Sequence, residues 1–139
     1  MSHSRRNLRP MRDYLCDYER VVEVGIGRRT DLAAALAQQG IAVTATDVYD
    51  RDTPDGVRFV RDNVVDPDRS VYADADAIYA RNLPPELHRP ALAVARAVDA
   101  DFLFTTLGGD QPAVPVERKT IREGTLYVAR AIDDGYSSH

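Results

Sequence analysis

Residues 21–32 hold the feature that most constrains the fold of this chain: an apolar run, two closely spaced glycines and the start of a helical pattern. The run ends at Gly25, Gly27 follows, and a second apolar run ends on Asp47. This order is typical of nucleotide sites at the edge of a parallel sheet. The glycines let the backbone pass close to a ligand. The segment therefore predicts a site for an adenosine-containing ligand, in which Asp47 accepts hydrogen bonds from the ribose hydroxyls.

Strand and helix patterns alternate over the first two-thirds of the chain, and this alternation indicates a parallel sheet covered on both faces. We expect strands at 21–25, 41–47, 57–60, 75–80 and 101–107, and helices at 8–18, 31–39 and 84–98. Two further strands, 116–122 and 125–131, flank Glu123-Gly124, which predicts an antiparallel hairpin. The predicted fold class is α/β, a minimal doubly wound Rossmann-like sheet that is mostly parallel and ends in this hairpin.

The connection at 48–56 is shorter than the dozen or so residues that a parallel crossover usually needs. We therefore expect loops where a full-size fold has helices. The 139 residues are expected to form a single domain, 1–139, that binds a nucleotide cofactor. Residues 133–139 are expected to be disordered.

The composition argues against several classes of function. A net charge of −4 argues against a general nucleic-acid binder. No apolar run approaches 18 residues, and no apolar segment follows the charged start, so we expect a cytoplasmic protein with no membrane span and no signal peptide. The basic patch Arg5, Arg6, Arg9 and Arg12 has two interpretations, a solvated helix face or a contact with phosphate. The preference for arginine, with Lys119 the sole lysine, resembles proteins of salt-accumulating archaea.

Cysteine and histidine offer little chemistry in this chain. Cys16 has no second cysteine to pair with, and of the three histidines only His88 lies away from the termini. We therefore expect no metal site, and we expect Cys16 to be a small buried hydrophobe rather than a nucleophile.

Glu23 distinguishes between the cofactors that a glycine turn can serve. Nicotinamide-binding loops normally have an apolar residue at this position, and a buried carboxylate without a partner costs several kcal/mol (about 2–7 even for a neutral polar group). The run Val22-Glu23-Val24-Gly25-Ile26-Gly27 resembles the first motif of S-adenosylmethionine-dependent methyltransferases. That resemblance implies a role for Glu23 toward the ammonium group of the ligand or the loop backbone. The chain departs from the motif at Arg29, which stands where these enzymes usually have a third glycine.

Two further segments extend the resemblance. Asp62 and Asn63 follow the third strand, where methyltransferases often bond the adenine amino group; solvation of an exposed pair is the alternative. Residues 80–85, Ala-Arg-Asn-Leu-Pro-Pro, occupy the place of the methyl-acceptor loop. They make Arg81 and Asn82 weak catalytic candidates, since a helix start explains both prolines without chemistry.

Taken whole, residues 5–131 resemble the uncharacterised protein family 0146 of archaea, through the Glu-Val-Gly-Ile-Gly loop, Asp47 and the Pro-Pro-Glu-Leu segment at 84–87. The resemblance implies a methyltransferase-like Rossmann fold and brings no established activity. Three interpretations stay open: a minimal methyltransferase with an unknown acceptor, a non-catalytic sensor of an adenosyl ligand or NAD, and a scaffold that pairs with another protein. Residues 25–28 are similar to dinucleotide-binding domains of potassium-transport regulators, which keeps NAD as the alternative cofactor. In the methyltransferase interpretation, a homodimer or a protein partner is expected to supply the acceptor surface.

Overall fold

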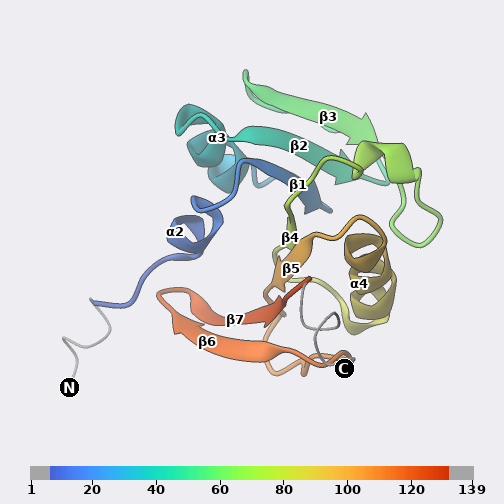
Figure 1. The fold of residues 1–139 in the computed structure, drawn as a ribbon. Coiled ribbons are helices and arrows are strands. Elements are labelled where there is room, and N and C mark those ends of the chain that lie inside the picture. Colours follow the sequence, from blue (N-terminus) through green and yellow to red (C-terminus); the bar gives the residue numbers. More distant parts are fainter. Residues whose placement is uncertain (1–6, 132–139) are drawn as a thin grey trace.

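A computed structural model describes residues 7–131 of the chain (Figure 1). In chain order, its helices and strands are α2 (Met11–Leu15), β1 (Arg20–Val24), α3 (Asp31–Gln38), β2 (Ala42–Asp47), β3 (Val57–Arg61), β4 (Ala77–Ala80), α4 (His88–Ala97), β5 (Asp101–Phe104), β6 (Glu117–Ile121) and β7 (Gly124–Ala129). Two short 3₁₀ turns, Arg69–Val71 and Pro85–Leu87, precede β4 and α4.

The described strands form one seven-stranded sheet in the order β3-β2-β1-β4-β5-β7-β6. Strands β1 to β5 pair in parallel, whereas β7 runs antiparallel to β5 and β6 antiparallel to β7. The order reverses at β1, because the chain first builds outward to β3 and then returns to place β4 on the other side of β1. Ligands of open α/β sheets bind at such a switch point, outside the carboxyl ends of the strands. The predicted fold class is confirmed.

Helices cover both faces of the sheet, as Figure 1 shows. Helices α2 and α3 pack on one face, in a core cluster that includes Val21 and Tyr79. Helix α4 packs on the other face, in a cluster that includes Val22 and Ile78. Because successive side chains of a strand point to opposite faces, Val21 and Val22 belong to different clusters. The shortened crossovers are also present, since the described chain forms no helix at 48–56 and only one 3₁₀ turn between β3 and β4.

The leading helix is shorter than the predicted 8–18. Pro10 has an extended backbone with ψ 163°, so α2 begins at Met11. It ends at Leu15. Its two buried residues, Met11 and Leu15, lie one turn apart. Cys16 is exposed, so the prediction of a buried cysteine was wrong. The residue caps the end of the helix, beyond the apolar stripe that faces the core.

Other predicted boundaries also shift, including the strands predicted at 75–80 and 101–107, which are shorter in the structure. The helix predicted at 84–98 divides into a 3₁₀ turn and α4, because Pro90 has no N–H to donate to the carbonyl four residues earlier. The hairpin turn lies one residue earlier than predicted, since Ile121 pairs with Gly124 and the turn consists of Arg122 and Glu123. The predicted disorder at 133–139 lies outside the described residues.

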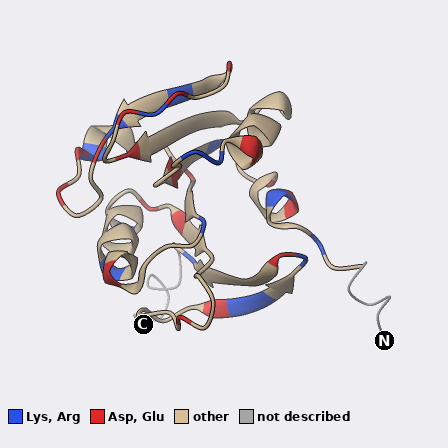
Figure 2. Cartoon of the chain, turned by 180° about the vertical axis from the view of Figure 1, so that it is seen from behind, with Lys and Arg blue, Asp and Glu red and all other residues tan. Residues whose placement is uncertain are grey.

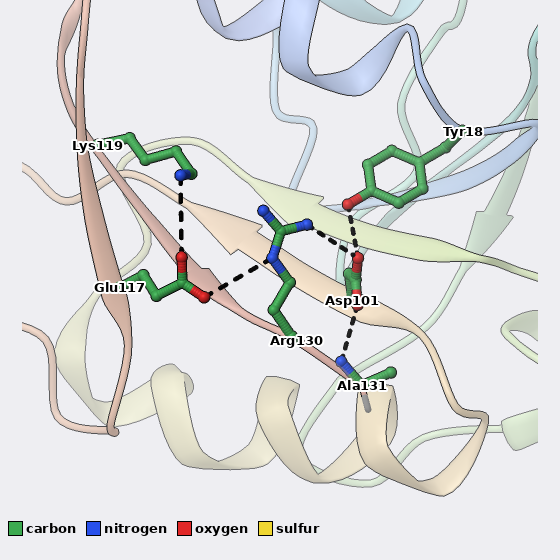
Figure 3. Close-up of polar contacts among 6 residues, drawn as sticks. All are labelled: Tyr18, Asp101, Glu117, Lys119, Arg130 and Ala131. Carbon is green, nitrogen blue, oxygen red and sulfur yellow. Dashed lines mark hydrogen bonds and ion pairs between the residues drawn. The ribbon is translucent and has the colours of Figure 1, made fainter. Parts of the chain in front are cut away.

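Asp101, at the amino end of β5, joins three separated segments of the chain (Figure 3). Its Oδ2 accepts a hydrogen bond of 2.7 Å from the Tyr18 hydroxyl, and its Oδ1 accepts one of 2.7 Å from the backbone N–H of Ala131. Arg130 adds an ion pair at 3.4 Å. Burial, together with the hydrogen bond to Asp101, raises the pKa of Tyr18. Because Asp101 begins its strand, this network lies at the opposite end of the sheet from the carboxyl ends.

We predict that Asp101→Ala lowers the free energy of unfolding by about 2 kcal/mol, since hydrogen bonds to a charged group contribute about 1.5–3 kcal/mol. Urea denaturation followed by circular dichroism measures the change. Glu117→Ala is the matched control, because its carboxylate is half exposed and makes only ion pairs of 3.8 Å. We expect a change within about 0.5 kcal/mol there. Equal effects of the two variants would show that the network does not depend on Asp101.

Candidate functional site

The glycine turn after β1 presents open backbone at the carboxyl edge of the sheet. Gly25 and Gly27 have φ values of +69° and +58°, which side chains rarely adopt. A Cβ built on either glycine would meet no atom within 4 Å. The turn is held by the N–H of Ile26, which donates 3.0 Å to the carbonyl of Thr46 on β2. Arg29 does not fill the space at either Cβ position, so a ligand can approach the backbone there.

Asp47 lies directly against this turn, at the end of β2. Its Oδ2 accepts a hydrogen bond of 2.8 Å from the N–H of Gly27, and its Oδ1 accepts one of 3.0 Å from the N–H of Tyr49. The Arg51 Nε lies 3.4 Å from Oδ2. The structure therefore brings together the two features that sequence analysis combined, the glycines and the acid of the second strand. Each carboxylate oxygen has more than one acceptor site, so these contacts leave capacity for a ligand hydroxyl.

Glu23 is buried, with 1% of its surface exposed. It pairs across the β1–β4 register with Tyr79, whose hydroxyl donates 2.8 Å to Oε1. Burial raises the pKa of the Glu23 carboxyl to about 7, against the lowering effects of Tyr79 and the nearby Arg81. The buried carboxylate thus has the partner that its burial requires, and the sequence pattern did not reveal that this partner is Tyr79.

Asp62 and Asn63 follow β3 at the same edge and hold the next loop. Asp62 accepts hydrogen bonds from the Tyr72 hydroxyl at 2.6 Å and from the N–H of Asp68 at 3.0 Å. The exposed Asn63 accepts 3.0 Å from the N–H of Val65. Both side chains therefore stabilise the 62–72 loop, and their predicted contact with adenine stays a prediction.

Arg81 and Asn82 follow β4. The Arg81 guanidinium donates to both carboxylate oxygens of Asp31, at 3.1 and 3.3 Å, and to the carbonyl of Arg29 at 2.9 Å. The hydrogen bond and charge of Arg81 lower the pKa of the Asp31 carboxyl. Asn82 has a φ of +53°, and its N–H donates 2.9 Å to Oγ1 of Thr105. Arg81 thus clamps the end of β4 to the start of α3, while the Asn82 side chain is exposed.

A cleft of about 870 Å³ opens beside these residues. One side is the start of α3 and the ends of β4 and β5; the other is α2 and the β6–β7 turn. The second side is tied together by two hydrogen bonds. The N–H of Met11 donates 3.1 Å to Oε1 of Glu123, and the N–H of Arg122 donates 3.0 Å to the carbonyl of Arg9.

The cleft was not predicted from the sequence. The chain's own residues line a volume that suits a small-molecule site, whereas the acceptor surface was expected from a partner. The sequence signal nearest to it was the predicted hairpin turn at Glu123-Gly124, since Glu123 and Gly124 both line the cleft. Of the basic patch, Arg12 lines the cleft and the Arg9 guanidinium lies 4.5 Å from the centre of the Tyr14 ring. Arg5 and Arg6 lie outside the described residues.

His88 holds a loop. It is fully buried, its Nδ1 accepts 3.0 Å from the N–H of Ala113, and its Nε2 therefore donates 2.9 Å to the carbonyl of Leu83. Within residues 7–131 there is no group of three or more His, Cys, Asp or Glu side chains that could hold a metal ion. In the same part of the chain, no helix has the length and apolar character that crossing a bilayer requires.

Comparison with known proteins identifies relatives of the sequence and of the fold. The uncharacterised protein family UPF0146 matches residues 11–132. A UPF0146 protein of Halobacterium salinarum is 57% identical over 117 residues, which cover 84% of this chain and 91% of the relative.

Among solved structures, the chain is similar to an RNA methyltransferase from Salinibacter ruber in complex with S-adenosyl-L-homocysteine. The TM-score is 0.61 at 14% identity, over 84% of this chain and 85% of that one. A TehB-like S-adenosylmethionine-dependent methyltransferase from Corynebacterium glutamicum gives a TM-score of 0.57 at 18% identity, over 79% of this chain and 78% of that one. At these identities the likeness establishes a methyltransferase-like fold.

Glu23 gives the fold a pH dependence with a defined sign. The folded protein keeps the Glu23 proton up to about pH 7, whereas the ordinary value is 4.5. Between these values the folded state binds more protons than the unfolded state, so stability falls as pH rises. We predict that Glu23→Gln, which lacks this titration, gains up to about 3 kcal/mol of unfolding free energy relative to the parent between pH 4 and pH 8. Urea denaturation across that range measures the difference.

Tyr79→Phe provides the matched variant for this test. It removes the hydroxyl that lowers the Glu23 pKa, so we expect the upper end of the pH window of lost stability to move upward while the lower end, set by the unfolded state, stays in place. Parallel pH profiles of the parent and Glu23→Gln would contradict the raised pKa.

Proposed function

Because the chain belongs to the uncharacterised protein family UPF0146 and has a methyltransferase-like fold, we propose that it binds S-adenosylmethionine at the glycine turn. We propose further that it is a minimal methyltransferase, whose acceptor occupies the cleft between α3 and the β6–β7 turn. The two similar solved structures named above support the proposal through the fold that they share with this chain.

One observation carries the proposal: the hydrogen bond of 2.8 Å from the Gly27 N–H to Asp47. It fixes an acidic side chain against an open glycine turn at the switch point of the sheet. A ribose needs this combination, since its two hydroxyls require an acceptor while its ring lies close to the backbone. The empty space beside both glycines fits such a ligand.

The residues after Asp47 fit an adenine ring. Val48 and Tyr49 are 47% and 64% exposed, which is high for large apolar side chains. Val65, after β3, is also exposed. Since these segments follow neighbouring parallel strands, they lie at one edge of the sheet. An adenine bound there would bury apolar surface that the protein otherwise leaves in water.

We propose that Glu23 acts on the amino-acid part of the ligand. The charges of Arg81, Asp31 and Arg29 influence its pKa, and all three residues line the cleft. Glu23 itself is not among the lining residues, and it lies two residues before the first glycine of the turn. We propose that its ionised form pairs with the ligand ammonium and that Arg29, in place of a third glycine, borders the methionine portion.

Methyl transfer needs little from side chains, because the bound sulfonium supplies an already activated methyl group. The chain has to orient an acceptor and exclude water. Asn82 and Thr106 line the cleft at the ends of β4 and β5, and we propose that they orient the acceptor. Arg81 is a positioning residue, since its bonds to Asp31 and Arg29 fix the loop that holds the ligand.

A non-catalytic binding module is the second candidate. The Tyr79 hydroxyl already occupies Oε1 of Glu23, and Asp62 uses both of its oxygens within the protein. These bonds favour a site that senses an adenosyl ligand or NAD without transferring a group. The calorimetric titration described next bears on this candidate, because it ranks the adenosyl ligands and NAD by affinity.

We predict micromolar binding of S-adenosylmethionine and S-adenosylhomocysteine, measured by calorimetric titration beside NAD and NADP. Asp47→Ala should weaken binding by about 1.5–3 kcal/mol, or roughly tenfold or more in Kd, the scale of hydrogen bonds to a charged group. Asp50→Ala is the control, since Asp50 is exposed three residues further along, and its Kd should stay within about twofold. Heat from NAD alone would favour the dinucleotide version, and no heat from a folded sample would refute the proposal.

Binding should also depend on pH. If the ligand ammonium pairs with ionised Glu23, only the deprotonated protein is competent, and the apparent Kd scales with that fraction. With a pKa of about 7, we predict about tenfold tighter binding of S-adenosylhomocysteine at pH 8 than at pH 6. Titrations in buffers of different ionisation enthalpy should detect the released proton. Glu23→Gln should bind with a Kd that does not change over this range, and a flat profile for the parent would remove Glu23 from the site.

A further inference from the structure

The cleft beside the glycine turn carries positive charge in an acidic protein. The whole chain has 22 acidic and 18 basic residues, and Figure 2 shows both signs spread over helices, strands and loops. The charged residues that line the cleft are mostly arginines: Arg12, Arg29, Arg81, Arg122, Asp31 and Glu123. The sign of the cleft is therefore opposite to that of the chain.

The two carboxylates of the cleft have partners within the protein. Asp31 receives two hydrogen bonds from Arg81, and Oε1 of Glu123 accepts the N–H of Met11. The positive charge of Arg81 is thus neutralised by Asp31. Arg12 forms its own ion pair of 3.8 Å with Asp13, so the excess of guanidinium groups lies with the two remaining arginines of the cleft.

Arg29 and Arg122 supply that excess from two different walls. Arg29 belongs to the loop before α3, and Arg122 to the β6–β7 turn. Both are exposed, and within residues 7–131 neither guanidinium makes a hydrogen bond or ion pair. Guanidinium groups bind phosphate with two parallel hydrogen bonds, and their planar fork suits phosphate oxygens better than a point charge does. An anion bound in the cleft would give both guanidinium groups the partner that they lack.

We infer that this cleft binds a phosphate-bearing small molecule, held by Arg29 and Arg122. The inference deepens the proposed function and rests on it in one respect: the bound molecule is then the methyl acceptor. The volume of about 870 Å³ lies within the range of small-molecule sites. The hydrogen bonds between α2 and the β6–β7 turn close one side, which suits a small molecule better than a nucleic-acid strand that must pass through.

The test is calorimetric titration of the full chain with inorganic pyrophosphate as the probe. We expect saturable 1:1 binding, and a loss of about tenfold or more in affinity for the double variant Arg29→Gln/Arg122→Gln. The matched control is Arg69→Gln/Arg89→Gln, which removes the same two charges from exposed positions outside the cleft. The pyrophosphate affinity of this control should stay within about twofold of the parent's. An equal loss of affinity in both double variants would show that net charge alone causes the effect, and this would overturn the inference. Thermal unfolding confirms that each variant folds.

Two other probes decide the chemical class. Succinate tests whether a carboxylate binds as well as a phosphate, and a short single-stranded RNA tests for a macromolecule. Tighter binding of either one than of pyrophosphate would overturn the inference. A parallel titration with S-adenosylhomocysteine separates the two proposals. Pyrophosphate binding without S-adenosylhomocysteine binding refutes the cofactor site alone. S-adenosylhomocysteine binding without pyrophosphate binding refutes the phosphate site alone.

Discussion

The hydrogen bond between the Gly27 N–H and Asp47 joins the carboxyl ends of β1 and β2 at the centre of the sheet. The geometry of the site depends on it. With the bond from Ile26 to Thr46, it holds a turn whose two glycines have positive φ and would otherwise be free to reorient. The α3 helix starts from this turn, so the position of Asp31, and through it the clamp formed by Arg81, follows from the same contact.

Opposing effects set the protonation of Glu23. Burial disfavours its charge, while the Tyr79 hydroxyl and the Arg81 guanidinium favour it, and the result is a pKa of about 7. Burial is the larger effect, because the pKa lies above the ordinary value of 4.5. A carboxyl group balanced in this way changes its charge within the physiological range, which an exposed glutamate does not do. The strand position that first suggested a methyltransferase motif therefore also carries a group whose charge changes near neutral pH.

The fold and the pairing of Asp47 with the glycines could be predicted, because both follow from local patterns. Apolar runs alternate with helical spacing, and carboxyl ends of parallel strands meet at one edge. The partner of Glu23 could not be predicted, since it depends on the register between β1 and β4. Nor could the exposure of Cys16, which depends on α2 ending at Leu15. The cleft was missed for the same reason: its wall rests on a contact between Met11 and Glu123, 112 residues apart.

That contact has a consequence for the order in which the cleft assembles. The glycine turn follows α2 closely in the chain, but the facing wall of the cleft also needs the β6–β7 turn, whose contact with Met11 spans 112 residues. Until that turn docks, one wall of the cleft is missing. Long-range contacts of this kind form late, after the loop entropy between their ends has been overcome. Assembly of the cleft therefore depends on docking of the β6–β7 hairpin, and a chain in which the hairpin is undocked lacks it.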